Sequence, residues 1–322
     1  MEKLRIAVIG AGHHGQHHAR ILAENPKCSL VAIIDRSRER AEEVARRWNT
    51  QGFKRSRKIY EMVDAVSIAV PTELHHKVAA DFLSRGIHCM VEKPITTTVE
   101  EAEDLINLAK EHNCVLQVGH SERYNAAIRY MRGILDRPAF IECHRLGPFD
   151  PRVAAVGVVL DLMIHDIDIV LQIVDSPLVS MDAVGVPVVS DKEDIANVRM
   201  KFENGATANL TVSRVSPRKQ RKIRIFQKEA YISIDCIKQS MELYRRVARP
   251  NAREGEPKAE ILCKRVHIKK EEPLKLELDD FLQTILEGKP PTVSGESARD
   301  ALHIAVEIGK AISQSKLGEK FK

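Results

Sequence analysis

One helical pattern in this 322-residue sequence carries ionisable residues at regular intervals. Asp161, His165 and Asp168 are spaced i, i+4 and i+7, so a helix would place all three on one face, with Asp166 pointing elsewhere. Two carboxylates and an imidazole on one face are unusual in a protein core. The pattern therefore predicts a helix that contributes to a functional site.

Two further segments place polar residues directly after apolar, strand-like runs. They are Val91-Glu92-Lys93-Pro94 and Gly119-His120-Ser121-Glu122-Arg123-Tyr124-Asn125. In open α/β sheets, ligands bind at the carboxyl ends of the strands. Both segments are thus expected at a ligand site.

A glycine-rich turn, Gly10-Ala11-Gly12-His13-His14-Gly15, lies between a predicted strand and a predicted helix. In the GxGxxG pattern the first glycine makes the turn, the second lets the backbone approach a pyrophosphate, and the third lets helix and strand pack closely. The free N–H groups of the helix N-terminus then bind the phosphates. This context predicts a dinucleotide site, with His13 and His14 inside the phosphate-binding turn.

Asp35, at the end of the next predicted strand, indicates which dinucleotide is bound. Its carboxylate can accept hydrogen bonds from the adenosine ribose hydroxyls and would repel a 2′-phosphate, which favours NAD over NADP. Arg36 and Arg38 follow at once and would pair with a 2′-phosphate if Asp35 turned aside. The structural alternative for Asp35 is a helix N-cap.

Four histidines, His13, His14, His17 and His18, include two pairs with the i, i+4 spacing of metal ligands on a helix. They belong to the phosphate-binding turn and its helix, and no carboxylate or thiolate nearby completes a ligand set. No metal site is therefore predicted.

The order of predicted elements indicates an α/β protein with two domains. Residues 1–119 alternate strands and helices, as in βαβ units that build the parallel sheet of a Rossmann domain. Residues 120–322 are expected to form an α+β domain on an open, mainly antiparallel sheet, with Glu203-Asn204-Gly205 as a hairpin turn. The predicted strands are 4–9, 30–34, 65–70, 88–92, 115–118, 179–186, 195–202, 206–212, 222–226 and 230–234; the predicted helices include 38–48, 99–111, 121–135, 158–174, 275–287 and 296–315, and 249–258 is a predicted loop.

Composition excludes several classes of protein. Apolar residues make up 43% of the chain, and 50 basic against 45 acidic residues give a net charge of +5. The basic residues are spread along the sequence, so no nucleic-acid partner is predicted. No apolar stretch approaches the roughly 20 residues of a membrane helix. The six cysteines form no CxxC pair, which favours a reducing cytoplasm.

Taken together, these segments resemble the Gfo/Idh/MocA family of sugar and cyclitol dehydrogenases. The resemblance covers almost the whole chain and rests on the glycine-rich turn with His18 in its helix, Pro71-Thr72 after a strand, the Glu92-Lys93-Pro94 triplet and the DxxxHxxD helix. It implies a Rossmann domain followed by an open-sheet domain that is usually used for oligomerisation. A homodimer or homotetramer is therefore expected.

The resemblance also implies roles for individual residues. Lys93 and His165 would contact the reacting hydroxyl, and Asp161 would support the same site; Pro71, Thr72, His75 and Glu92 would lie near the nicotinamide or ribose. These residue types suit the oxidation of a secondary alcohol, in which a histidine accepts the proton and an ammonium stabilises the alkoxide. The structural alternatives are a surface lysine at a strand end and a hydrogen-bonded structural histidine.

Two segments indicate the substrate. Residues 119–127 and 212–226 resemble family members that oxidise UDP-linked N-acetyl sugars at C3, and the predicted substrate is UDP-N-acetylglucosamine. Arg123, Asn125, Arg218 and Lys219 are the candidates for binding the diphosphate or its sugar. For Arg218 and Lys219 the alternative is a solvated basic strand edge.

Two other functions remain open. One is a dehydrogenase of a free sugar or inositol, and the other is a non-catalytic sensor of nucleotide or sugar. The presence of both Lys93 and His165 favours an enzyme over the sensor.

Overall fold

The computed structural model describes residues 3–151, 155–249, 257 and 259–315, and it divides into two compact units. The first unit comprises Met1–Ser121 and Glu272–His303, and the second comprises Glu122–Glu271 and Ile304–Lys322. The boundary expected between residues 119 and 120 assigned 272–303 to the second domain, whereas this segment belongs to the first compact unit. The chain thus leaves the first unit, returns to it and leaves it again.

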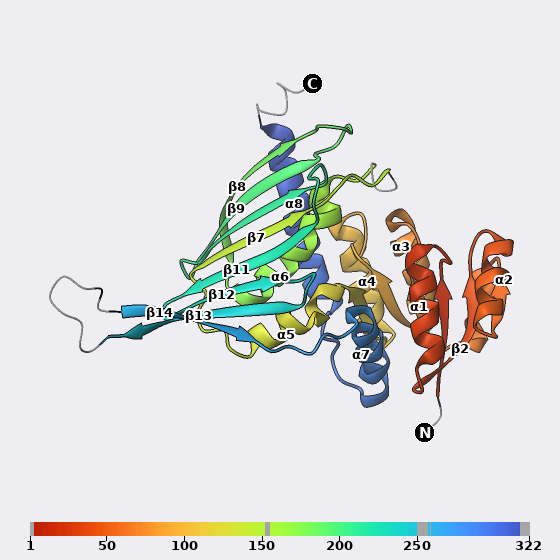
Figure 1. The fold of residues 1–322 in the computed structure, drawn as a ribbon. Helices are drawn as coiled ribbons and strands as arrows, with labels where there is room; N and C mark the ends of the chain where they lie inside the picture. The colour runs from red at the N-terminus through yellow and green to blue at the C-terminus, as the bar shows by residue number, and fades with distance from the viewer. Residues whose placement is uncertain (1–2, 152–154, 250–256, 258, 316–322) are drawn as a thin grey trace. The chain divides into compact units, whose positions relative to one another are not determined.

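The first unit is built on a six-stranded sheet with the order β3-β2-β1-β4-β5-β6 (Figure 1). All neighbouring strands are parallel. The order reverses between β1 and β4, which is the point where open α/β sheets bind ligands. Its elements are β1 (Leu4–Ile9), α1 (His13–Glu24), β2 (Cys28–Ile34), α2 (Arg38–Arg47), β3 (Gln51–Phe53), β4 (Ala65–Ile68), α3 (His75–Leu83), β5 (His88–Glu92), α4 (Val99–Glu111), β6 (Leu116–Gly119), α7 (Pro273–Glu287) and the first part of α8 (Gly295–Gln314).

Helix α7 joins the first unit because its apolar side chains complete that unit's core. Leu278, Phe281 and Leu282 are fully buried in one cluster with the inward-facing side chains of β1 and α1. The side chain of Gln117 on β6 also donates a hydrogen bond to the carbonyl of Glu277 (3.0 Å). The parallel sheet therefore depends on a segment that follows the second unit in the sequence.

The second unit is built on an eight-stranded sheet with the order β14-β13-β12-β11-β7-β10-β9-β8. Neighbouring strands are antiparallel except β7 and β10, which are parallel. Helices α5 and α6 lie on one face of this sheet (Figure 1). The elements are a 3₁₀ turn η4 (Ser121–Tyr124, whose first residue belongs to the first unit), α5 (Ala126–Arg132), β7 (Phe140–Leu146), a π-helical turn η6 (Val159–Met163), α6 (Ile164–Val174), β8 (Leu178–Val186), β9 (Ile195–Phe202), β10 (Thr207–Ser213), β11 (Gln220–Gln227), β12 (Ala230–Asp235), β13 (Ser240–Ala248), β14 (Ala259–Val266) and the last part of α8.

The fold class predicted from the sequence is confirmed, with differences in detail. The hairpin at Glu203-Asn204-Gly205 is present, and Gly205 has the positive φ (+86°) that such a turn requires. Strands β3, β7, β13 and β14 were not predicted. Strand β7 was missed because Arg145 takes one of its buried positions, where the alternation of a strand predicts an apolar residue.

Two predicted segments also differ. The helix expected over 121–135 is divided at Asn125, whose side chain caps the N-terminus of α5. The helix expected over 158–174 begins with the π-helical turn. Most of the loop predicted at 249–258 lies outside the described residues. Within the described part of the chain, no helix is long and apolar enough to cross a membrane.

Candidate active site

The glycine-rich turn after β1 has the geometry of a phosphate-binding turn. Gly10 has a φ of +99°, and a Cβ there would lie 2.4 Å from the carbonyl oxygen of Ala69. A Cβ on Gly15 would lie 1.8 Å from the carbonyl oxygen of Gly10, so this glycine lets α1 pack against the strand. At Gly12 a Cβ would meet nothing within 4 Å. The turn therefore leaves open space at the N-terminus of α1, where backbone N–H groups favour a phosphate.

The histidines of this turn lie around the first turn of α1. The rings of His13 and His17 meet edge to face with centroids 4.9 Å apart, and His13 meets His14 in the same way at 5.7 Å. Partial burial lowers the pKa of His14, and the charge of Glu92 opposes this change. In the described residues, no group of three or more candidate ligands is arranged to hold a metal ion.

Asp35 links the end of β2 to the glycine-rich turn. Its carboxylate accepts hydrogen bonds from the backbone N–H groups of Ala11 (2.9 Å) and Ser37 (2.8 Å). The N-cap of α2 is Ser37 rather than Asp35. Two backbone bonds leave lone pairs on the carboxylate for ribose hydroxyls, so the geometry fits the adenosine half of a dinucleotide.

The arginines near Asp35 are placed differently from one another. Arg38 is exposed and pairs with Glu42 at 2.7 Å. Arg36 is exposed. Arg40, which the sequence analysis did not single out, lies 3.9 Å from the Asp35 carboxylate. The charge of Arg40 therefore favours the ionised form of the Asp35 carboxylate.

Glu92 is fixed by a buried hydrogen-bond chain at the end of β5. The ring of His18, which is fully buried, bridges the hydroxyl of Ser67 (2.6 Å) and the carboxylate of Glu92 (3.0 Å). Burial raises the pKa of Glu92, but the hydrogen bond and charge of His18, with His14 and Lys93, outweigh burial and lower this pKa to about 2. Glu92 is therefore a carboxylate at neutral pH, directly beside Lys93.

His75 connects the ends of two strands. Its Nδ1 lies 2.8 Å from the carbonyl oxygen of Pro94, and its Nε2 lies 2.9 Å from that of Val70. The residue is 1% exposed. His75 lies between the segments after β4 and β5, with each ring nitrogen within hydrogen-bond distance of a carbonyl oxygen; its contact with the nicotinamide stays a prediction. Pro71 is exposed on one of these segments, and Lys93 is half-buried before a cis bond to Pro94 on the other.

In the second unit, the turn η6 and helix α6, together called the acidic helix, carry ionisable residues that differ in burial. Asp161 lies in the π-helical turn η6, and it is half-buried, as is His165. Asp168 and Asp166 are 1% and 2% exposed. Asp161, His165 and Asp168 were expected on one accessible face. Only Asp161 and His165 are partly accessible, because the side chain of Asp168 is buried in the core.

Arg123 and Asn125, for which substrate binding stays a prediction, both make contacts within the second unit. The guanidinium of Arg123 forms a bidentate pair with Asp168 (2.7 and 2.5 Å). The side chain of Asn125 caps α5 and donates to the carbonyl of Cys236 (2.9 Å). Both side chains are buried, so they position η4 and α6 relative to the sheet.

A second buried arginine was not identified from the sequence. Arg145 on β7 forms a bidentate pair with Asp166 (3.0 and 2.8 Å) and donates to Glu122 (3.0 Å). Burial lowers the pKa of Arg145, but the charges of Asp166 and Glu122 dominate and raise it well above its usual value. Arg221 also donates to Glu122 (3.1 Å).

Arg218 and Lys219 lie on the turn between β10 and β11, and both are exposed. The turn is tied to the end of β7, because Ser216 N donates to Gly147 O (2.9 Å) and Gly147 N donates to Ser213 O (2.9 Å). Gly147 begins the segment that precedes η6. The two cations therefore belong to the same end of the sheet as the start of the acidic helix.

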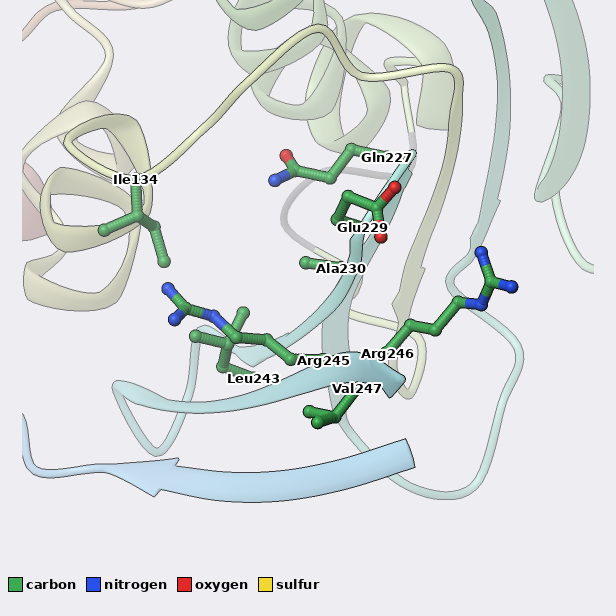
Figure 2. A pocket seen from close by; sticks show the side chains of 8 residues that line it. All are labelled: Ile134, Gln227, Glu229, Ala230, Leu243, Arg245, Arg246 and Val247. Atoms are coloured by element: carbon green, nitrogen blue, oxygen red, sulfur yellow. The ribbon is translucent and has the colours of Figure 1, made fainter. Parts of the chain in front are cut away.

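One hollow of the second unit lies away from all these residues. It has a volume of about 280 Å³ and lies beside β12 and β13. Figure 2 shows Arg245 extending toward Ile134, while Arg246 points away. None of the residues predicted from the sequence to act in catalysis, cofactor binding or substrate binding lines it; the lining residues are Ile134, Gln227, Glu229, Ala230, Leu243, Arg245, Arg246 and Val247.

The parallel sheet, the glycine-rich turn and the acid after β2 define an oxidoreductase with an NAD-binding Rossmann fold. Residues 4–120 match the GFO/IDH/MocA oxidoreductase family, NAD-binding Rossmann fold. Residues 127–233 match the GFO/IDH/MocA C-terminal domain. The chain belongs to the Gfo/Idh/MocA family.

Among its relatives is the UDP-N-acetylglucosamine 3-dehydrogenase of Acidithiobacillus ferrooxidans, which is 37% identical over 97% of this chain and 98% of its own. A solved structure of that protein has a TM-score of 0.91, covering 100% of this chain and 99% of its own. The scyllo-inositol 2-dehydrogenase of Bacillus subtilis is 29% identical over 67% of this chain and 68% of its own.

We expect the enzyme to prefer NAD to NADP, and Asp35→Asn to reduce that preference. The substitution keeps the shape of the side chain but removes a charge that would repel a 2′-phosphate. The ratio of kcat/KM with NAD to kcat/KM with NADP should therefore fall by roughly tenfold or more. Steady-state kinetics with both cofactors measure this. Glu43→Gln, which removes an exposed carboxylate further along α2, is the control. A wild-type kcat/KM that is higher with NADP would contradict the prediction.

We expect Glu92→Gln to lower the free energy of unfolding of the first unit at pH 7 by up to about 3 kcal/mol. Because the folded-state pKa of Glu92 is lowered to about 2, its contribution is fully present above about pH 4.5 and is lost as the pH falls toward 2. The gap between variant and wild type should therefore close over that range.

Urea titrations followed by fluorescence measure this gap, because Trp48, the only tryptophan, packs against the core of this unit. Glu61→Gln, at an exposed carboxylate of the same unit, is the control. A gap that is constant from pH 7 to pH 3 would count against the assigned role of Glu92.

Proposed function

We propose that this protein oxidises the C3 hydroxyl of UDP-N-acetylglucosamine to the ketone, with NAD as the hydride acceptor. The observation that carries the proposal is the similarity, over 97% of the chain, to a relative named UDP-N-acetylglucosamine 3-dehydrogenase. Lys93, His165 and Asp161 are all present in positions that match the family's motifs.

In this proposal three residues divide the chemistry. His165 accepts the hydroxyl proton, because imidazole has a pKa near the working pH. Lys93 stabilises the developing alkoxide with its ammonium group. Asp161 orients the imidazole and stabilises its charged form. NAD, when bound, supplies the acceptor for the hydride.

The cofactor contacts follow from the ends of the parallel strands. Gly10, Gly12 and Gly15 admit the pyrophosphate, and Asp35 accepts from the ribose. His13 and His14 lie beside the phosphates, and Pro71, Thr72 and Glu92 lie near the nicotinamide. His75 supports this end of the sheet by holding two loops together, consistent with its buried position.

For the substrate, we assign the diphosphate to Arg218 and Lys219. Both are exposed cations on a turn that is hydrogen-bonded to the segment before η6. A guanidinium fork suits phosphate oxygens. Arg123 and Asn125 then act as positioning residues, because their polar groups are already used inside the unit.

A free inositol or sugar is the second candidate substrate. The inositol dehydrogenases among the relatives favour it, since one is 29% identical over two-thirds of the chain. Such a substrate would need no cation on the turn between β10 and β11. A non-catalytic sensor is the third candidate, and it predicts binding without turnover.

We also propose that the chain forms a homodimer or homotetramer through the open face of the eight-stranded sheet. A row of aromatic rings crosses four strands on this face, with Phe140 tilted against Phe226 (5.6 Å), Phe226 stacked on Tyr231 (4.6 Å) and Tyr231 stacked on Tyr244 (4.9 Å). On β14, Ile261 is 73% exposed. Apolar groups of this kind favour cover by a second copy.

A reducing compartment such as the cytoplasm is consistent with the six cysteines, all of which are free thiols. Burial raises the pKa of Cys28 and Cys114 to about 11, so neither is a thiolate at neutral pH.

We expect Lys93→Ala and His165→Ala each to reduce kcat by about 10²- to 10⁴-fold, while NAD binding and folding are retained. The loss follows from removing the charge at the alkoxide or the proton acceptor. Measurement of NADH formation at 340 nm gives kcat, and quenching of Trp48 fluorescence gives the affinity for NAD. Near-normal turnover by His165→Ala would assign the base to another group.

We expect UDP-N-acetylglucosamine to be turned over far more efficiently than N-acetylglucosamine or myo-inositol. A diphosphate provides remote binding energy that positions the sugar, so removing it should lower kcat as well as affinity. Arg218→Ala and Lys219→Ala should each raise KM about tenfold, as expected for a lost charged hydrogen bond.

The control is Lys238→Ala, which removes an exposed cation from the turn between β12 and β13. Equal efficiency with a free sugar or inositol would reject the nucleotide-sugar substrate. Binding of these compounds without any NADH formation would favour the sensor.

We expect Ile261→Asp or Phe226→Asp to weaken the oligomer, because either places a charge in the proposed interface. Light scattering coupled to size-exclusion chromatography measures the mass across micromolar concentrations. Ile237→Asp changes a residue of similar exposure (50%) on the turn between β12 and β13 and serves as the control. A monomeric wild-type protein at these concentrations is incompatible with the proposal.

A further inference from the structure

Arg214, at the end of β10, is buried and connects three segments of the second unit. Its Nε donates to Asp194 Oδ1 (2.6 Å), one terminal nitrogen donates to the carbonyl of Val156 (2.6 Å), and the other donates to the hydroxyl of Ser190 (2.8 Å). It is 2% exposed. The rigid fork of the guanidinium directs its donors to separate acceptors, so Arg214 links these segments. We call Arg214 and its partners Asp194, Val156 and Ser190 the junction.

The carboxylate of Asp194 organises the loop between β8 and β9. Its Oδ2 accepts from the backbone N–H groups of Val188 (2.7 Å), Val189 (2.7 Å) and Ser190 (3.0 Å). Burial raises the pKa of Asp194, but these bonds and Arg214 hold it well below its usual range. The loop therefore closes around a fully buried charge that is paired with Arg214.

The neighbouring Glu193 holds the start of the acidic helix. Its carbonyl accepts from Val158 N (3.1 Å), and its Oε1 accepts from Val159 N (3.2 Å). A Cβ on Gly157 would lie 1.9 Å from that same oxygen, so a side chain at this position would displace the capping carboxylate. The helix that carries Asp161 is therefore capped by the β8–β9 loop.

The chain that carries Arg214 continues into the turn between β10 and β11, which we call the basic turn because it carries the exposed Arg218 and Lys219. Arg214 N donates to Asp194 O (2.9 Å), and two residues later Ser216 N donates to Gly147 O. Arg218 and Lys219 follow directly. The loop held by Arg214 thus caps the acidic helix, while the chain that carries Arg214 continues into the basic turn.

We propose that Arg214, acting with Asp194 and Glu193, is a positioning residue that fixes the start of the acidic helix relative to the basic turn. This inference rests on the proposed function, in which Asp161 and His165 act on the sugar and Arg218 and Lys219 bind the diphosphate. The junction sets the spacing between these two parts of a nucleotide-sugar site. Arg214 itself touches neither substrate nor cofactor.

Two variants test the junction at different points. Arg214→Lys keeps the positive charge next to Asp194 but cannot reach Val156 and Ser190 at once, because an ammonium lacks the fork. Gly157→Ala leaves Arg214 intact and displaces the Glu193 carboxylate from Val159 N. Arg129→Gln is the matched control, because it breaks an exposed ion pair with Glu271 (2.8 Å) in the same unit.

Three measurements are made on each full-length variant. We expect kcat with UDP-N-acetylglucosamine to fall about 10- to 100-fold in both variants, as for a catalytic group displaced by about 1 Å. NAD affinity and the Trp48 unfolding midpoint should stay unchanged, since both report the first unit. Hydrogen exchange should accelerate at the amide of Val159 in both variants, and at Val188–Ser190 in Arg214→Lys alone.

The outcomes separate this inference from the proposed function. If the wild type does not oxidise UDP-N-acetylglucosamine, the proposed function fails, and the exchange pattern still decides whether the junction exists. If the wild type is active but Arg214→Lys and Gly157→Ala both keep kcat within twofold, the positioning role is overturned. Unchanged exchange at Val159 also overturns it. If Arg214→Lys does not fold, Gly157→Ala decides by the same two criteria.

Discussion

Two buried arginine–aspartate pairs fix helix α6, and the arrangement of the second unit depends on them. Asp166 pairs with Arg145 from β7, and Asp168 pairs with Arg123 from η4. Residues two apart in a helix point about 200° away from each other. The helix is therefore held from two sides and cannot rotate, which leaves Asp161 and His165 half-buried.

Such pairs are retained at a cost. Removing a guanidinium and a carboxylate from water is unfavourable by several kcal/mol per ion, and only bidentate geometry with further hydrogen bonds offsets this. Glu122 supplies one of those further bonds to Arg145. The pairs therefore fix the orientation of α6 more than they add to the net stability of the second unit.

The first unit uses the same principle with hydrogen bonds. His18 and Ser67 fix the Glu92 carboxylate beside Lys93, and His75 ties the segments after β4 and β5. In both units these buried polar groups are hydrogen-bonded to one another, and they fix the segments that carry them. A substitution at one of these internal partners should lower the catalytic rate, although the substituted residue does not contact the substrate.

Local features of the sequence were enough to predict the strand, turn and helix that open the Rossmann fold of the first unit. The Gly10–Gly15 turn and Asp35 were assigned correctly as parts of a Rossmann fold, because each role depends on a backbone position next to a strand end. Helix Val99–Glu111 and strand His88–Glu92 also have the predicted bounds. Periodicity and turn chemistry act over a few residues, so a single sequence reveals them.

Only the tertiary structure decided which charged residues are buried. The sequence does not show that Arg123 meets Asp168, 45 residues away, or that Arg145 meets Asp166. It also gave no sign that residues 272–303 return to the first unit. These outcomes depend on which distant segments pack together, because an ionisable side chain enters a core only where the fold brings it a partner of opposite charge.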